Sequence, residues 1–221
     1  MNRLIIIVEG DTEKEFIDSV LSPYLYSKGL QSISSFKIKH TKGGLVKYQH
    51  LKTDLINCVY ESDVVISTLI DYYALPEDFP KYDESKKIIN KSDRLCYLEK
   101  AIIEDVESEQ DKRFPNLLPY IQLHEFEALV FSSIDGFKSL FSDEEANFIE
   151  IQDIISKYPN PEDINNNILT APSKRLENMI RGYNKVVDGI MIIEEIGIET
   201  ILAKCPRFNS WVQRLIEQVN K

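Results

Sequence analysis

The sequence has few cysteines and no long hydrophobic run. Its three cysteines, Cys58, Cys96 and Cys205, are far apart among 221 residues, and no two have the spacing of a metal-binding pair. We therefore expect buried, reduced thiols and no disulfide framework. The apolar run at residues 4–8 is too short for a signal peptide or a membrane span, and Glu9 follows it at once. These absences predict a cytoplasmic protein without membrane attachment.

Basic residues are fewer than acidic residues. The chain has 26 Lys and Arg against 36 Asp and Glu, a net charge of −10. This balance disfavours a general nucleic-acid coat but not a nuclease, because carboxylates that hold metal make a protein acidic. Residues 28–52 contain six lysines and no acid, whereas residues 104–111 contain five acids and no base. A solvated surface explains either run, but the basic run, with Lys37, Lys39 and Lys42, is the best candidate for contacting phosphates.

Hydrophobic patterning predicts strands that alternate with helices over the first 133 residues. Apolar runs predict strands at residues 3–8, 33–39, 63–70 and 117–123, and helical spacing predicts helices at residues 12–23, 45–60, 84–110 and 124–131. After residue 133 the pattern is helical with short breaks. We predict a single α/β domain with a mostly parallel sheet flanked by helices. Its α/β core would span residues 1–133, and a helical extension would span residues 134–221.

Two of the predicted strands end in a carboxylate. Glu9 follows the first strand and Asp71 follows the third. In open α/β sheets, ligands bind outside the carboxyl ends of the strands, so on adjacent strands these acids would meet in one crevice. Their repulsion would be costly without a cation, which predicts Mg²⁺ or Mn²⁺. Glu13 lies one helical turn after Glu9 and is a further ligand candidate, although it also suits the helix dipole.

The stretch Val8-Glu9-Gly10-Asp11-Thr12-Glu13 resembles the opening motif of TOPRIM domains, as found in the overcoming-lysogenization-defect nucleases. Ile70-Asp71-Tyr72-Tyr73 resembles their second motif, a strand-end Asp-x-Asp. The chain is similar to a family of small bacterial TOPRIM-like proteins of uncharacterised function, a resemblance that includes DYYALPEDFP, IQLHEFEALVF, TAPSKRL and CPRFNSW. It implies a TOPRIM-like sheet and Mg²⁺ held by Glu9 and Asp71 for phosphodiester cleavage or transfer. It also implies an ABC-type ATPase partner and a role in anti-phage defence.

Tyr73 departs from this pattern, because it stands where an Asp-x-Asp motif has its second Asp. A phenol is a poor Mg²⁺ ligand at neutral pH, so either another acid supplies the ligand or metal binding is weaker. Glu127 is the preferred replacement, since similar nuclease-like families have a Phe-Glu pair at the corresponding place. Glu125 and Asp78 are the alternatives.

The segment TAPSKRL places two cations at a predicted helix start, after Ser173 as a possible N-cap. Lys174 and Arg175 oppose the helix dipole there, which suggests a nearby anion such as a phosphate or a metal-site carboxylate. TOPRIM nucleases use a lysine to support the transition state, and the resemblance implies Lys174 for this role. Arg175 is a candidate for nucleic-acid contact, although exposed surface charge explains both residues as well.

Three functions fit these features. The first is a metal-dependent nuclease with Glu9, Asp71, Glu127 and Lys174 as catalytic residues and Glu13 as a further metal ligand. The second is a catalytically decayed TOPRIM-like module that binds an ATPase. The third is phosphotransfer or phosphatase activity on a small molecule at the same acidic crevice. A nucleic acid substrate, an ATPase partner and a homo-oligomer are the expected partners.

Overall fold

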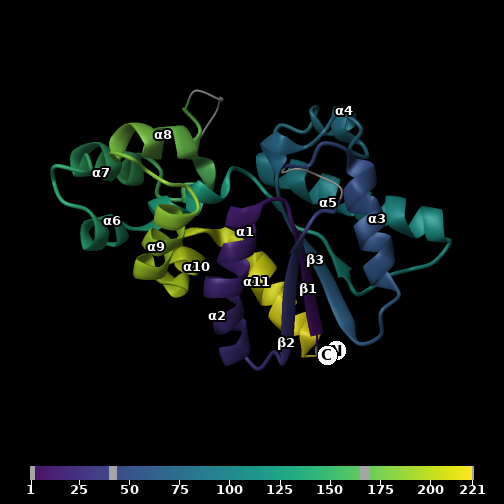
Figure 1. Ribbon diagram of the computed structural model, residues 1–221. Helices are drawn as coiled ribbons and strands as arrows, with labels where there is room; N and C mark the ends of the chain where they lie inside the picture. Colours follow the sequence, from purple (N-terminus) through teal and green to yellow (C-terminus); the bar gives the residue numbers. More distant parts are fainter. Residues whose placement is uncertain (1–2, 40–43, 165–169, 221) are drawn as a thin grey trace. The chain divides into compact units, whose positions relative to one another are not determined.

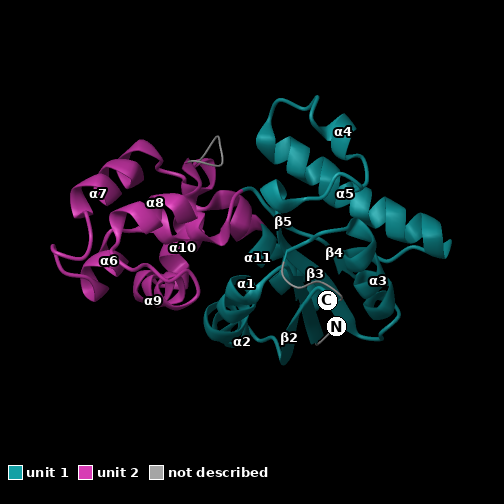
Figure 2. Ribbon diagram, turned by 45° about the horizontal axis from the view of Figure 1, so that its top comes forward, with its two compact units in different colours: residues 1–123, 211–221 teal, residues 124–210 magenta. Residues whose placement is uncertain are grey.

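The computed structural model describes residues 3–39, 44–164 and 170–220, which form two compact units (Figures 1 and 2). Unit 1 comprises residues 1–123 and 211–221, and unit 2 comprises residues 124–210. Patterning placed the change to helical structure at residue 133, whereas the units divide after Leu123. Lys42, one of the predicted phosphate contacts, lies outside the described residues.

Unit 1 is built on a parallel sheet, as the sequence predicted. Strands are paired in the order β2-β1-β3-β4, with β5 also pairing β3, and every pair is parallel. The strands are β1 (Arg3–Val8), β2 (Ser32–Lys37), β3 (Val64–Asp71), β4 (Leu117–Leu118) and β5 (Ile121–Gln122). The predicted α/β fold with a mostly parallel sheet flanked by helices is therefore confirmed.

The predicted strand at residues 117–123 is two short strands. Pro119 separates them and has no N–H to donate to the ladder. The next N–H, that of Tyr120, donates to Thr68 Oγ1 of β3 at 2.9 Å, and the Thr68 hydroxyl donates in turn to the Tyr120 carbonyl. At the interruption between β4 and β5, hydrogen bonds to the Thr68 side chain therefore replace backbone bonds to β3.

Helices cover both faces of the sheet. Ile5 and Ile7 of β1 belong to one apolar cluster with Leu51 and Leu55 of α3, and α5 joins the same cluster. Figure 1 shows α3 on one side of the strands and α1 and α2 on the other. The helices of unit 1 are α1 (Asp11–Phe16), the π-helical turn η1 (Ile17–Leu21), α2 (Ser22–Ser27), α3 (Tyr48–Val59), the 3-10 turn η2 (Tyr72–Ala74), α4 (Tyr82–Ser85) and α5 (Lys91–Gln110).

The last helix, α11 (Pro206–Val219), returns the chain to unit 1. Trp211 stacks on Tyr120, with ring centroids 4.5 Å apart and an interplanar angle of 12°. Its indole N–H donates to Ser67 Oγ of β3 at 2.9 Å. Phe208 and Trp211 are both buried, at 0% and 3% exposure.

Unit 2 is helical throughout its described part. Its elements are η3 (Phe126–Ser132), α6 (Asp135–Leu140), α7 (Phe148–Lys157), η4 (Pro161–Asp163), α8 (Pro172–Met179), α9 (Val187–Ile196) and α10 (Ile198–Lys204). The predicted α-helix at residues 124–131 is the 3-10 segment η3. Buried Glu162 accepts the backbone N–H groups of Arg207 and Phe208 at 2.9 and 3.0 Å, so a carboxylate caps the start of α11.

Two smaller expectations were wrong. Ser173 is not an N-cap, since Ala171 holds that position at the start of α8. Cys96 is exposed, whereas Cys58 and Cys205 are buried as expected, and all three are free thiols. Among the described residues, no helix is long and apolar enough to cross a membrane.

Candidate functional site

The carboxylates of the two predicted strand ends lie at one edge of the sheet. Strands β1 and β3 are parallel neighbours with Val8 opposite Leu69, so Glu9 and Asp71 leave the sheet side by side. The backbone N–H of Asp71 donates to Glu9 Oε2 at 3.1 Å. Both residues are partly exposed. The structure therefore brings the two central candidates together at the carboxyl edge, where open α/β sheets bind ligands.

A glycine turn approaches Glu9 from another part of the chain. The backbone N–H of Leu45 lies 3.4 Å from Glu9 Oε1. Gly44 has a φ of +75°, and a Cβ added to it would lie 3.6 Å from the same oxygen. Glycine adopts this left-handed conformation at no steric cost. The Gly44–Leu45 turn thus places a backbone N–H against the carboxylate, which fixes the direction of the Glu9 side chain.

Glu13 lies close to the same segment. It occupies the first turn of α1, and its Oε2 would stand 2.8 Å from a Cβ added to Gly10. Gly10 directly follows Glu9, so the Glu13 carboxylate folds back toward the strand end. A side chain at position 10 would displace the Glu13 carboxylate from this position. Glu13 remains a candidate third carboxylate of this edge.

Asp71 orders the turn that follows it. Its Oδ1 accepts the backbone N–H of Tyr73 at 2.9 Å, so Asp71 is the N-cap of the 3-10 turn η2. Tyr73 is 50% exposed, and burial raises the pKa of its hydroxyl above the ordinary value. A neutral phenol is a poor Mg²⁺ ligand, so Tyr73 does not replace the second Asp of an Asp-x-Asp pair.

Glu127, the preferred replacement ligand, belongs to unit 2. It is fully buried, and its Oε2 lies 3.0 Å from Lys185 Nζ. Burial raises the pKa of Glu127 to about 7, although the neighbouring Lys185 lowers it. Sequence reasoning missed Lys185, which lies in a stretch without any motif and has no periodic signal. The convergence of Glu127 with Glu9 and Asp71 stays a prediction.

The cations of the TAPSKRL segment have partners inside unit 2. Glu125 Oε2 accepts the backbone N–H of Ser173 at 3.0 Å. Lys174 Nζ lies 2.6 Å from Glu177 Oε2 in an exposed pair. Arg175 Nε donates to the Thr170 carbonyl at 2.8 Å. Glu125 therefore caps the start of α8 through a backbone N–H. The anion expected near Lys174 and Arg175 and the catalytic role of Lys174 stay predictions.

The other candidates have structural contacts in unit 1. Lys37 pairs with Asp11 at 2.6 Å, and Lys39 Nζ lies 5.2 Å from the ring centroid of Phe36. Asp78 Oδ1 accepts the backbone N–H of Tyr48 at the start of α3, at 3.0 Å. Asp78 therefore has a capping role, and the lysines present charge at the surface near β2.

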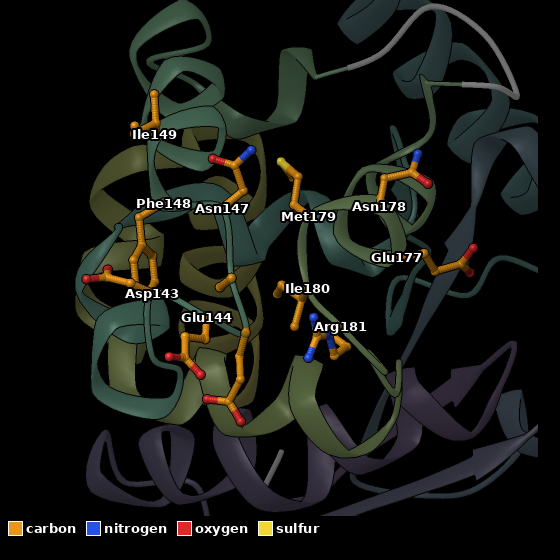
Figure 3. Close-up of a pocket in the computed structure, with 12 residues that line it drawn as sticks. Asp143, Glu144, Asn147, Phe148, Ile149, Glu177, Asn178, Met179, Ile180 and Arg181 are labelled. Atoms are coloured by element: carbon orange, nitrogen blue, oxygen red, sulfur yellow. The ribbon is translucent and has the colours of Figure 1, made fainter.

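A separate hollow lies within unit 2. Figure 3 shows it between the segment at residues 143–149 and the segment at residues 177–181. Its volume is about 610 Å³. An isolated antiparallel β-bridge between Ala146 and Ile180 joins the two segments. Its lining has acidic residues, apolar residues and Arg181, and none of the predicted site residues.

The carboxyl edge of the sheet fits a divalent cation of the hard, oxygen-binding kind. Among the described residues, no three His, Cys, Asp or Glu side chains gather closely enough to hold a metal ion by themselves. Mg²⁺ is commonly bound through one or two carboxylates, with water and substrate phosphate as the other ligands. A carboxylate offers about four lone-pair positions, so Glu9 can accept N–H bonds and still ligate a cation.

Comparison with curated proteins and with solved structures gave no match. One family model, described as a domain of unknown function (DUF4276), matches residues 8–216. The match begins at the last residue of β1 and includes Glu9, Asp71, Glu127 and Lys174. It covers nearly the whole chain and spans both compact units. The chain therefore belongs to the DUF4276 family.

Proposed function

We propose that this protein is a divalent-metal-dependent nuclease that hydrolyses phosphodiester bonds at the carboxyl edge of its sheet. The observation behind the proposal is the pairing of Glu9 and Asp71 at the ends of neighbouring parallel strands. Mg²⁺ is commonly bound in proteins through one or two carboxylates, and these two lie at the same edge of the sheet. The resemblance of their two motifs to those of TOPRIM domains supports the same chemistry.

Glu9 and Asp71 would hold Mg²⁺ or Mn²⁺ in this site. Such a cation, when bound, lowers the pKa of a ligated water and polarises a phosphoryl oxygen. The protein's own contribution is to orient the ligands. The N–H of Asp71 and the N–H of Leu45 direct the Glu9 carboxylate, while the N–H of Tyr73 directs Asp71. Ligands fixed in this way need little reorganisation when substrate arrives.

The partners follow from the resemblance and the charge. We propose a nucleic acid substrate and an ABC-type ATPase partner in cytoplasmic anti-phage defence, with a homo-oligomer as a further possibility. The net charge of −10 favours help from a partner, because an acidic chain attracts nucleic acid weakly.

A second function is favoured by Tyr73. The neutral phenol two residues after Asp71 leaves this edge one carboxylate short of the TOPRIM pattern. A catalytically decayed site would then leave a module that binds an ATPase and does not cleave.

The test is a titration of Mg²⁺ and Mn²⁺ with plasmid, single-stranded DNA and RNA as substrates. The nuclease proposal expects metal-dependent cleavage that disappears in Glu9→Gln, which keeps the shape and removes one charge. Metal binding without cleavage, with and without the ATPase, would support the decayed module. Absence of metal binding would contradict the nuclease proposal.

A further inference from the structure

Tyr73 is a half-exposed aromatic residue two positions after Asp71. Its backbone N–H is bound to Asp71 Oδ1 at 2.9 Å, and its side chain is 50% exposed. Only one residue separates it from Asp71, within the 3-10 turn η2. A substrate whose phosphate lies at Glu9 and Asp71 would therefore have its nearest sugar and base within reach of this ring.

The ring rests on a rigid support. Tyr72 is 7% exposed, and its ring meets that of Tyr73 edge to face, with centroids 5.2 Å apart at 78°. Arg94 Nη1 donates to the Tyr72 hydroxyl at 3.0 Å. The Nε and Nη2 of Arg94 both donate to the Ile88 carbonyl, at 3.0 and 2.7 Å. Because the supporting layer is fixed from α5, Tyr73 loses little further freedom when a ligand packs against it.

Other exposed tyrosines do not share this setting. Tyr60 is 54% exposed, but it directly follows α3, which leads into the start of β3, and so lies toward the amino edge of the parallel sheet. Tyr26 is 47% exposed on α2, which leads into the start of β2 and so lies toward the amino edge of the parallel sheet. Single exposed aromatic residues are common, so the position of Tyr73 beside Asp71 is what distinguishes it.

We propose that Tyr73 stacks on an unpaired base of the substrate, and hence that the substrate class is single-stranded nucleic acid. This assignment rests on the proposed nuclease function and deepens it. Every base offers a π-face, so an aromatic ring binds single strands with little regard to sequence. In a duplex the bases already stack on one another, and a protein ring reaches one only where the strand is frayed or flipped. At position 73, tyrosine would then provide a substrate contact where an Asp-x-Asp motif provides a metal ligand.

The test is binding of the full chain to labelled single-stranded DNA, single-stranded RNA and duplex DNA, in Ca²⁺ to limit cleavage. Tyr73→Leu removes the π-face and keeps an apolar side chain, whereas Tyr73→Phe keeps the ring. Tyr26→Leu is the matched control at similar exposure. The stacking assignment expects single-stranded binding about 5- to 150-fold weaker in Tyr73→Leu, with little loss in Tyr73→Phe or Tyr26→Leu. Duplex binding should change much less, and the two single-stranded probes distinguish DNA from RNA.

Thermal unfolding of each variant shows whether it is folded. Single-stranded binding by the wild type that is equal in Tyr73→Leu would overturn the stacking assignment and leave the nuclease proposal standing. A loss in Tyr73→Phe as large as that in Tyr73→Leu would also overturn it, because it would assign the contact to the hydroxyl. Wild-type protein that binds no probe, with or without metal, would overturn both proposals.

Discussion

The backbone N–H of Asp71 donates to Glu9 Oε2 at 3.1 Å, across the neighbouring strands β3 and β1. Through this bond, the backbone at the end of β3 holds the carboxylate of the residue that follows β1. The same Asp71 uses its side chain to order the turn that follows, through the N–H of Tyr73. Because backbone N–H groups bind both carboxylates, these two acids are more constrained than two acids on an open surface. The metal proposal starts from this arrangement.

Tyr73→Asp tests whether a carboxylate at position 73 would act as a metal ligand. The change restores an Asp-x-Asp pair and should strengthen Mn²⁺ binding, because a third carboxylate adds a hard oxygen ligand. Without metal the same variant should be less stable, since like charges repel. Tyr73→Asn is the control of equal size without charge. Calorimetric Mn²⁺ titration of both variants measures the effect, and equal Mn²⁺ affinity in Tyr73→Asp and wild type would place Tyr73 away from the metal.

Cleavage by Tyr73→Asp separates two accounts of the site. A decayed site should gain metal affinity without gaining activity. An active nuclease should cleave before and after the change, with weaker binding of single strands once the ring is lost.

Glu127 predicts a pH dependence of stability in metal-free protein. Its pKa is about 7 in the folded chain against an ordinary 4.5, so the native state holds a proton that the unfolded state releases. The free energy of unfolding should therefore fall as pH rises from about 4.5 to 7, by up to about 3 kcal/mol, and level off above 7. Glu127→Gln should flatten this dependence in chemical denaturation series. A wild-type profile that rises across this window would contradict the assignment.

Trp211→Phe tests the return of the last helix to the sheet. The variant keeps an aromatic ring near Tyr120 but loses the indole N–H that donates to Ser67 Oγ. The expected loss is about 1–2 kcal/mol in the free energy of unfolding, from the lost hydrogen bond and imperfect packing. Denaturant unfolding of Trp211→Phe, Ser67→Ala and the double variant gives the coupling between them. Additive losses would show that the bond contributes nothing.

Salt tests the mode of nucleic-acid binding. An acidic chain with a few surface lysines should bind weakly alone, and its affinity should fall steeply with salt because phosphate contacts release counterions. Addition of the ATPase partner should raise both binding and cleavage. Tight, salt-insensitive binding by the isolated chain would contradict this picture.

Sequence patterning predicted the elements that position the site. Residues 3–8 and 63–70 are continuous apolar runs, which is the signature of strands buried on both faces, and they form β1 and β3. The meeting of Glu9 with Asp71 could be expected because parallel strands bring their carboxyl ends to one edge. The interruption of the strand at residues 117–123 does not show in the apolar pattern, because Pro119 continues the run but has no N–H for the ladder.

Long-range polar contacts could not be read from the chain. Glu125 caps a helix 48 residues later, and Lys185 pairs with Glu127 from a stretch without periodicity. Glu162 caps α11 through Arg207 and Phe208. These partners are set by tertiary packing, which brings one buried carboxylate to one helix start, and local spacing has no signal for it.

The most direct measurement is Mn²⁺-dependent thermal unfolding of wild type and Asp71→Asn, paired with cleavage of single-stranded DNA and RNA. Asn keeps the size of the side chain and an oxygen that can accept the N–H of Tyr73, so folding should be preserved. We predict that Mn²⁺ raises the melting temperature of the wild type but not of Asp71→Asn, that the variant is at least as stable without metal, and that its cleavage falls to background. An Asp71→Asn protein that responds to Mn²⁺ and cleaves as the wild type does would contradict the metal assignment.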